Sequence, residues 1–245
     1  MGLLLPKETS KPKAKLEDFT IFIYGQPKIG KSTFCSQMDH PLFLATEAGL
    51  NSLEAYQVPV DNWETFVQAA AEIAKGDHKF KTIVIDTVDN LLKFCSDYMC
   101  KKAGVIHESD LEWGKGWSLV NNEFLRVLTK LSLLPYGLVM VGHSEITEIK
   151  TRTGSTNKVV PTLNKGGRKS VLGMADIILY AEIAAKQKGE DTEEIRVLRT
   201  KPSENYEAGD RTGILPPVVK LNFTEFKKAF DEGMAKKQNG GVINA

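Results

Sequence analysis

The sequence lacks any long hydrophobic run and carries almost no net charge. No apolar stretch approaches the ~20 residues that a membrane-spanning helix needs, and the opening segment 1–7 is too short in apolar residues for a secretory signal. The formal net charge is +1, so bulk basicity does not indicate a nucleic-acid-binding protein, and any contact with DNA must come from a local patch. We therefore expect a cytoplasmic protein with no membrane partner.

Cysteine and histidine are also scarce. The chain has three cysteines and four histidines, and neither set has the spacing of zinc ligands. An odd number of cysteines in a chain without a secretory signal predicts free thiols. Cys35 falls inside a predicted helix, where we expect it to pack as a small apolar side chain. Any chemistry must therefore come from other residue types.

What the chain does have is a regular alternation of apolar strands and amphipathic helices, within 245 residues of ordinary composition. The alternation predicts an α/β fold, with a mostly parallel central sheet and helices on both faces. Polar and apolar residues alternate on both sides of turn-forming residues 151–157, which predicts a projecting β-hairpin. The expected strands are 19–24, 41–46, 82–86, 137–142, 176–182 and 194–200. The expected helices are 31–38, a helix capped by Asp61 or Asn62 that runs to about 75, 88–102, 119–133 and 224–235.

Three regions are expected along the chain. Residues 1–18 carry several lysines and two prolines, which predicts a flexible basic arm. The arm is either a solvated tail or a segment that binds phosphate or links subunits. Residues 19–235 form the main domain, and residues 236–245 form a disordered C-terminal tail. Two tryptophans, Trp113 and Trp117, are expected to pack at a helix start.

The segment from Gly25 to Ser32 fits the P-loop pattern G-x-x-x-x-G-K-[ST] at every constrained position, between a predicted strand and a predicted helix. Glycine permits the tight turn that aims backbone N–H groups at phosphate oxygens, and the helix N-terminus adds partial positive charge. We expect Lys31 to reach the β- and γ-phosphates of ATP and to act in catalysis, and Ser32 to ligate Mg²⁺. An accidental glycine-rich turn is the alternative. The expected nucleotide contacts are Gly25, Gln26, Pro27, Lys28, Ile29, Gly30, Lys31, Ser32 and Thr33.

Carboxylates follow two of the predicted strands. Asp86 ends strand 82–86 and can hold Mg²⁺ as a Walker B aspartate does, or it can cap the helix that follows. Many P-loop ATPases place a catalytic glutamate directly after that aspartate, but this chain has Thr87. Glu47 is the candidate for orienting the attacking water, because parallel sheets place ligand sites at the carboxyl ends of their strands. A solvated loop glutamate is the alternative.

His143 follows the predicted strand 137–142, directly before the hairpin. A polar side chain there can contact the γ-phosphate and transmit its loss to the hairpin. The alternative is a histidine that satisfies a loop carbonyl.

Together, three segments resemble the RecA-like ATPases. Residues 43–50 are similar to the segment that carries the catalytic glutamate, 83–87 to the Walker B strand, and 141–145 to the phosphate-sensing segment. The Gly-His-Ser-Glu and Arg-Thr-Lys-Pro sequences also resemble phage-encoded, RecA-related ATP-binding proteins of the single-strand annealing and recombination group. The resemblance spans about residues 19–220. It implies a RecA-like P-loop NTPase core, ATP and Mg²⁺ as cofactors, slow DNA-stimulated ATP hydrolysis, and self-association into a ring or filament.

The resemblance also implies single-stranded DNA as a partner, with a single-stranded-DNA-binding protein as a second. The hairpin and the loop after it take the places of the two DNA-binding loops of RecA. An ordinary solvated basic surface is the alternative, and no stacking aromatic lies in the hairpin. The candidate DNA contacts are Lys150, Arg152, Lys158, Arg168 and Lys169.

By the same resemblance, Arg199 and Lys201 reach the nucleotide of a neighbouring subunit. The alternative is a pair of surface cations that protect an edge strand from pairing.

The sequence thus favours an ATPase that acts on single-stranded DNA in phage recombination or replication. A nucleotide-dependent protein-interaction switch that does not touch DNA is the main alternative. A small-molecule P-loop kinase is disfavoured, because no arginine-rich lid is apparent.

Overall fold

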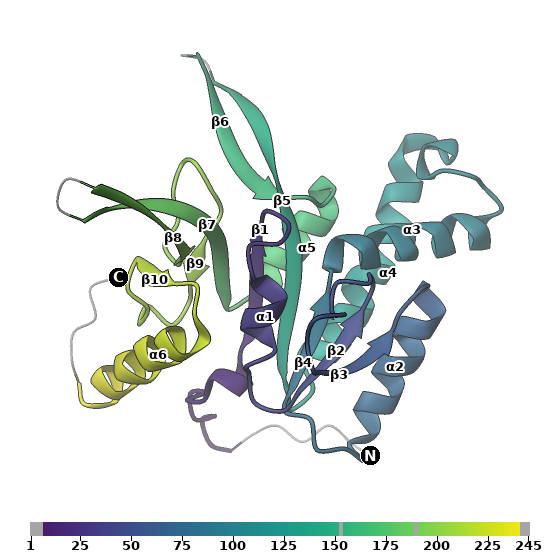
Figure 1. The fold of residues 1–245 in the computed structure, drawn as a ribbon. Helices are drawn as coiled ribbons and strands as arrows, with labels where there is room; N and C mark the ends of the chain where they lie inside the picture. Colours follow the sequence, from purple (N-terminus) through teal and green to yellow (C-terminus); the bar gives the residue numbers. More distant parts are fainter. Residues whose placement is uncertain (1–6, 152–153, 189–190, 241–245) are drawn as a thin grey trace.

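The computed structural model describes residues 7–151, 154–188 and 191–240 (Figure 1). It is built around one sheet with the strand order β10-β8-β7-β1-β5-β4-β2-β3, to which β6 is added beside β5 and β9 beside β7. The strands are β1 Thr20–Gly25, β2 Pro41–Ala45, β3 Tyr56–Pro59, β4 Thr82–Asp86, β5 Gly137–Thr151, β6 Gly154–Pro161, β7 Ile177–Lys188, β8 Asp191–Arg199, β9 Gly209–Asp210 and β10 Val218–Lys220. The helices are η1 Leu16–Asp18, α1 Lys31–Cys35, α2 Trp63–Lys75, α3 Val88–Ala103, η2 Glu108–Asp110, η3 Glu112–Gly114, α4 Lys115–Ser132, α5 Lys165–Met174 and α6 Phe223–Gln238.

The core of the sheet is parallel. β1 pairs with β5 and β7, β4 pairs with β5 and β2, and β2 pairs with β3, all in parallel. The carboxyl ends of β1, β2, β4 and the first half of β5 therefore meet at one edge, where a ligand site is expected. The predicted α/β fold with a mostly parallel central sheet is confirmed.

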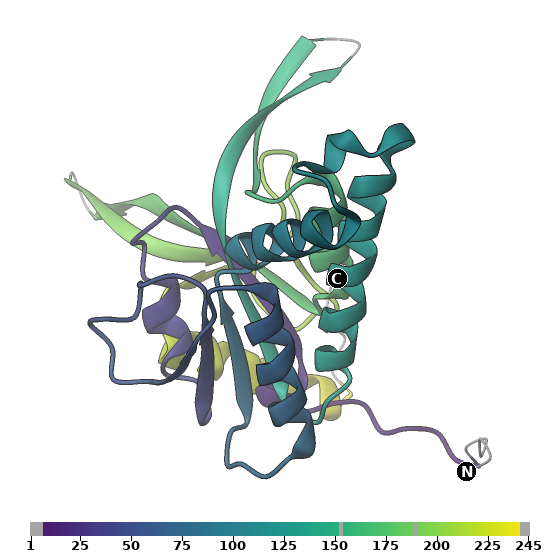
Figure 2. The same cartoon turned by 90° about the vertical axis from the view of Figure 1, so that its right-hand side faces the viewer.

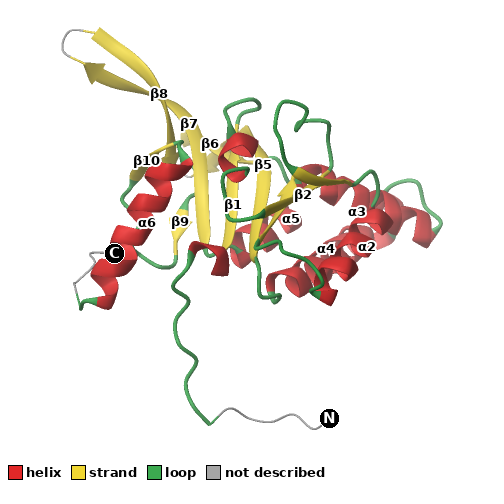
Figure 3. Cartoon of the chain, turned by 60° about the horizontal axis from the view of Figure 1, so that its bottom comes forward, coloured by secondary structure: helices red, strands yellow, loops and turns green. Residues whose placement is uncertain are grey.

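Two hydrophobic clusters cover the two faces of this sheet. β1 sends Phe22 and Tyr24 into one cluster and Ile21 and Ile23 into the other, as the alternation of a strand requires. Helices α2, α3, α4 and α5 pack on the first face, and η1, α1 and α6 pack on the second (Figure 3). The expected helices on both faces are thus present, and Cys35 is fully buried in the second cluster.

β5 is longer than the sequence predicts, because it runs without a break from the core into the hairpin. His143 is its last residue paired in parallel with β1, and from Ser144 onward the strand pairs antiparallel with β6. The predicted hairpin is therefore a direct continuation of a core strand, and it projects far beyond the sheet (Figure 2).

A second hairpin, formed by β7 and β8, is not predicted by the sequence. The sequence indicates two separate strands over 176–182 and 194–200, but the ladder continues outward from Tyr180–Arg199 to Lys188–Asp191. Its outer half is rich in charged residues and carries no clear apolar alternation, so nothing in the pattern distinguishes it from a loop. β8 lies between β7 and β10, so the idea that its cations protect an edge strand is wrong.

Several boundaries also differ from the prediction. The packed domain begins before the expected boundary at residue 19, because Leu16 in η1 is buried in the second cluster. α6 continues through Gln238, beyond the expected start of the tail at 236, whereas residues 1–6 and 241–245 lie outside the described part of the chain. α4 begins at Lys115, not at 119.

The expected packing of two tryptophans at the helix start is wrong for Trp113. Its side chain is 92% exposed, while Trp117 is 38% exposed. Trp113 has left-handed backbone angles, φ 59° and ψ 28°, that direct it away from the helix.

Candidate functional site

The P-loop joins β1 to α1 and is held closed by its own lysine. Gly30 has left-handed backbone angles, φ 113° and ψ 19°, a conformation that favours glycine. Lys31 is only 6% exposed, and its ammonium donates to the carbonyl oxygens of Gly25 and Gln26, both at 2.9 Å. Burial lowers the pKa of Lys31, and the nearby Asp86 opposes this shift. The ammonium is thus preorganised inside the loop that the sequence identified.

Not every predicted P-loop residue faces the site. Gly25 packs against β7 so closely that an added methyl group would lie 2.4 Å from the carbonyl oxygen of Ala181. Ile29 is buried in the second cluster and anchors the loop to the core. Gln26 contributes its carbonyl oxygen to Lys31. These three residues shape the loop.

The other predicted P-loop residues line a cleft of about 610 Å³ at the carboxyl edge of the sheet. Glu47, Asp86 and His143 line the same cleft. The structure therefore brings together every residue for which the sequence predicted a catalytic or metal-binding role. The cleft is lined by Pro27, Lys28, Gly30, Lys31, Ser32, Thr33, Glu47, Ala48, Gly49, Ser52, Leu53, Asp86, Thr87 and His143.

Asp86 ends β4 and bonds directly to the P-loop. The Ser32 hydroxyl donates to Asp86 Oδ2 at 2.6 Å, and Asp86 is only 3% exposed. Burial raises the pKa of Asp86, while the Ser32 hydrogen bond and the charge of Lys31 oppose this shift. A hydroxyl and a carboxylate oxygen at this separation are the ligands that Mg²⁺ takes beside substrate phosphates.

The donor set fits a nucleotide-bound cation. Among the described residues, no cluster of three or more His, Cys, Asp or Glu side chains could form a metal cage, and Mg²⁺ at nucleotide sites is usually held by one or two carboxylates, phosphates and water. Thr87 lines the cleft, and its buried hydroxyl has no hydrogen-bond partner within the described chain. A buried hydroxyl without a partner at the edge of a cleft is suited to a ligand or to a water held by one.

Glu47 is positioned by an interlock between the ends of two strands. The Thr46 hydroxyl donates to the carbonyl oxygen of Thr87 at 2.9 Å and accepts from its N–H at 2.7 Å. This pair of hydrogen bonds fixes the end of β2 beside the end of β4, so Glu47 emerges next to Asp86. Glu47 Oε2 then accepts from Asn90 Nδ2 at 3.1 Å, which leaves Oε1 to face other groups.

His143 is held by a carboxylate, not by the loop carbonyl that was the alternative. Its Nδ1 lies 2.6 Å from Asp89 Oδ2, and its backbone N–H also donates to the Asp89 carboxylate. The Asp89 hydrogen bond raises the pKa of His143, against the opposing effect of burial. The carboxylate thus stabilises the charged form of the ring and fixes its orientation.

Asp89 and Asn90 are functional candidates that the sequence reasoning missed. Both lie in the first turn of α3, directly after the Walker B strand, and they hold His143 and Glu47 respectively. Their positions, three and four residues after Asp86, could have indicated them in the sequence, because the first helical turn after β4 must lie beside the cleft. Their partners, however, come from β5 and from the loop after β2, and no local pattern indicates that pairing.

The two residues predicted to contact a neighbouring subunit, Arg199 and Lys201, are not among the residues that line this cleft. Arg199 Nε donates to Glu182 Oε1 at 2.6 Å, so this guanidinium is paired within its own chain. Lys201 follows β8 and is half-buried. Both remain predictions.

The predicted DNA contacts are only partly available. Lys158 pairs with Glu207 at 2.8 Å, and an Arg168 nitrogen lies 3.7 Å from Glu145. Lys169, on α5, is exposed. Arg152 lies outside the described residues, and Lys150 belongs to β5 but its side chain is not described. A basic face at this end therefore depends mainly on the lysines of α5.

The parallel sheet, the P-loop closed by its lysine, and the Ser32–Asp86 pair define a P-loop nucleoside triphosphatase domain. The family model described as "AAA domain" (AAA_24) matches residues 17–212, and the chain belongs to this family. Among the described residues, no helix has the length and apolarity to cross a membrane.

Relatives are distant. The SPbeta prophage-derived uncharacterized protein YorG of Bacillus subtilis (strain 168) is 28% identical over 171 residues, which cover 67% of this chain and 51% of that protein. The chain thus spans about half the length of this curated relative. A KaiC-like protein of Pyrococcus horikoshii OT3 aligns with a TM-score of 0.41 and 13% identity, covering 75% of this chain and 80% of the other. The flagellar accessory protein FlaH of Methanocaldococcus jannaschii aligns with a TM-score of 0.39 and 11% identity, covering 74% and 78%.

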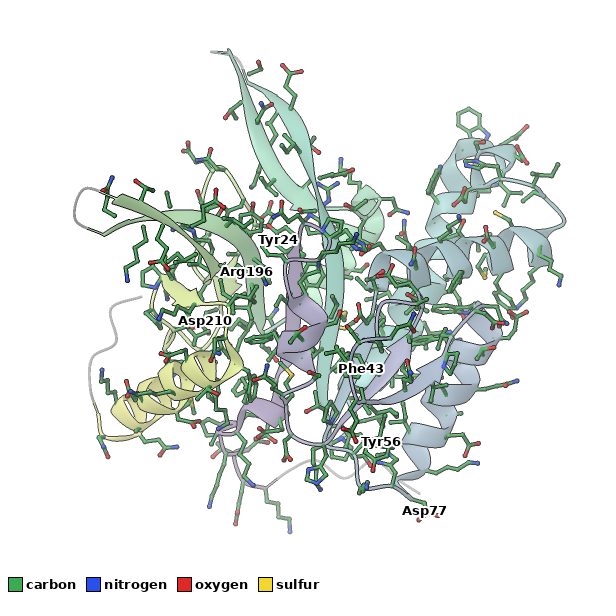
Figure 4. The ribbon with its side chains drawn as sticks, viewed as in Figure 1. Tyr24, Phe43, Tyr56, Asp77, Arg196 and Asp210 are labelled. Atoms are coloured by element: carbon green, nitrogen blue, oxygen red, sulfur yellow. The ribbon has the colours of Figure 1, made fainter. Side chains whose placement is uncertain are left out.

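Arg196 is a further residue that the sequence reasoning missed. It lies on the face of β8 opposite to Arg199, and a methyl group added to Gly30 would lie 3.7 Å from its guanidinium. Figure 4 places Arg196 between the β7–β8 hairpin and α1. No salt bridge to Arg196 occurs in the described part of the chain. An arginine without a carboxylate partner beside a phosphate-binding loop is suited to a phosphate oxygen.

We expect Arg196→Gln to raise the Kd for ATP and for ADP by about three- to tenfold, since one partly exposed charged hydrogen bond is lost. Isothermal calorimetry with both nucleotides measures this. Arg126→Gln is the matched control, because its guanidinium pairs with Glu123 on α4 and Arg126 is not among the residues that line the cleft. Unchanged affinity in Arg196→Gln would remove Arg196 from the nucleotide site.

Proposed function

We propose that this protein hydrolyses ATP with Mg²⁺ and acts on single-stranded DNA in phage recombination or replication. The observation that carries the enzymatic part is the convergence of Lys31, Asp86, Glu47 and His143 on one cleft. The prophage origin named for the Bacillus relative supports the phage setting. The DNA part rests on the resemblance to RecA-related proteins and on the projecting hairpin beside the site.

Each side chain has a role that follows from its position. Lys31 and the backbone N–H groups of the P-loop bind the β- and γ-phosphates. Ser32 and Asp86 hold Mg²⁺, which when bound neutralises charge that develops on the phosphate oxygens. Glu47 orients the attacking water through Oε1 while Asn90 holds Oε2. His143 donates to the γ-phosphate from the ring edge opposite its bond to Asp89.

Loss of the γ-phosphate would be transmitted through β5. His143 is the residue at which β5 changes from core strand to hairpin strand, so a shift of its ring acts on a continuous ladder. The same α3 turn holds Glu47 through Asn90, which links the sensing residue to the residue that orients water. One helical turn that holds both side chains fits an element with a phosphate-bound and a released state.

Self-association into a ring or filament completes this proposal. Arg199 and Lys201 would approach the neighbour's nucleotide once Arg199 exchanges Glu182 for phosphate. The basic arm, residues 1–18, is a candidate link between subunits. A single-stranded-DNA-binding protein is a further candidate partner on the same DNA.

The test is the ATPase rate of the full chain with and without oligo(dT), at low and moderate salt, with sizing chromatography in ATP, in ADP and without nucleotide. We expect stimulation by oligo(dT) that weakens as salt rises, because phosphate contacts release counterions. Hydrolysis with neither stimulation nor DNA binding at low salt would instead identify a nucleotide-dependent protein-interaction switch. Phosphate transfer to a small acceptor would identify a kinase.

A further inference from the structure

The connection between α3 and α4 presents two large apolar side chains to solvent. Ile106 is 96% exposed and Trp113 is 92% exposed. Trp113 also has left-handed backbone angles, which bulky residues rarely adopt and which cluster at functional sites. The exposed indole is thus maintained at a conformational cost, and packing of this side chain does not explain it.

The loop that carries Trp113 is firmly built. Asp110 accepts hydrogen bonds from the N–H groups of Ile106, at 3.1 Å, and His107, at 2.8 Å. Glu108 is buried and accepts from the Ser96 hydroxyl. A methyl group on Gly116 would lie 2.1 Å from the Glu108 carbonyl oxygen, so the loop backbone packs directly on α4. The position of the indole is therefore set by a well-packed support.

This loop lies at the same end of the molecule as the β5–β6 hairpin, as two perpendicular views show (Figures 1 and 2). The start of α5 packs closely on α4, since Gly166 leaves no room for a methyl group beside the Asn121 side chain of α4. Exposed lysines lie on α3, α4 and α5, and in the described part of the chain those named below on α4 and α5 form no salt bridge. These are Lys101 and Lys102 on α3, Lys115 on α4, and Lys165 and Lys169 on α5.

The five lysines outnumber the three acids of the loop. Glu108 and Asp110 accept hydrogen bonds inside the loop, and Asp110 and Glu112 are exposed residues near Trp113. A flat exposed aromatic ring among lysines matches a ligand with flat rings and regularly spaced negative charge. Single-stranded nucleic acid has both, and stacking on an aromatic side chain is its usual mode of binding.

We propose that Trp113 is a stacking platform for a base of single-stranded DNA, whose phosphates lie along Lys115, Lys165 and Lys169. The proposal rests on the proposed function, which takes DNA as the partner. It supplies the stacking aromatic that the hairpin lacks. It also moves the DNA surface from the paired side chains of Lys158 and Arg168 to lysines of α4 and α5 that form no salt bridge in the described part of the chain.

The stacking role can be tested by fluorescence anisotropy. A labelled oligo(dT) is titrated with the full chain at a series of salt concentrations. We expect Trp113→Ala to raise the Kd at least about fivefold, and Trp113→Phe to retain most of the affinity. The slope of log K against log[salt] is negative and should be unchanged in Trp113→Ala. Lys165→Gln and Lys169→Gln should each reduce the magnitude of this slope by about 0.7, because each variant loses one phosphate contact. Leu133→Ala is the matched control, since Leu133 is 79% exposed beyond the other end of α4.

The outcomes separate this inference from the proposed function. A parent chain that binds oligo(dT), with equal affinity in Trp113→Ala, overturns the stacking role and leaves the DNA-acting ATPase standing. A parent chain that does not bind oligo(dT) overturns both. If Trp113→Ala abolishes self-association on sizing and leaves DNA affinity intact, the surface is a contact between copies and the stacking proposal is wrong.

Discussion

Lys31→Ala is expected to abolish measurable nucleotide binding, with a rise in Kd of at least about a hundredfold. Lys31 is buried and lines the cleft together with Asp86, and its ammonium bonds to two loop carbonyls. Removal of one partner from a buried charged contact costs about 2–5 kcal/mol, and each 1.4 kcal/mol is about a tenfold change. Calorimetry with ATP and Mg²⁺ measures the loss.

The matched control for Lys31→Ala is Lys93→Ala. Lys93 is an exposed lysine on α3 and is not among the residues that line the cleft. It should keep nucleotide affinity within about threefold, because an exposed charge away from the cleft contributes little. Equal losses in both variants would mean that positive charge in general, and not the position of Lys31, governs binding. Circular dichroism of both variants excludes unfolding as the cause.

The parallel core can be predicted from the sequence because its signals are local. Strand 82–86 is apolar on both faces, and helix 63–75 has an N-cap at Asn62 and a glycine at its end. The residues of each such element are enough to identify it. The P-loop is likewise contained in eight consecutive residues, so the sequence alone predicts its place between β1 and α1.

The parts that could not be predicted depend on distant partners. Nothing local shows that Asp89 holds His143, since the two are 54 residues apart in sequence. The outer half of the β7–β8 hairpin is stabilised by cross-strand pairing, while its residues look like a polar loop. The sequence predicts a packed Trp113 because aromatic residues are usually buried, and only its left-handed backbone reveals the outward direction.

Glu47→Gln is expected to keep ATP binding and to lower the turnover number by about 10²–10⁴, the range for loss of a positioned general base. The amide retains the shape of the side chain and can still accept the Asn90 hydrogen bond, but it cannot take a proton from water. Steady-state phosphate release and calorimetry separate turnover from affinity. Glu54→Gln, in the exposed loop that follows β2, is the matched control and should hydrolyse ATP at the parental rate.

This result matters because we propose for Glu47 the role of the glutamate that many P-loop ATPases carry directly after the Walker B aspartate. The Thr46–Thr87 interlock fixes the ends of β2 and β4 side by side, so a residue that follows β2 lies in the same cleft as Asp86. If Glu47→Gln hydrolysed ATP as fast as the parent, the interlock would have only a structural role. The water would then have to be oriented by another polar side chain of the cleft, and His143, which the Asp89 carboxylate holds in place, is the next candidate.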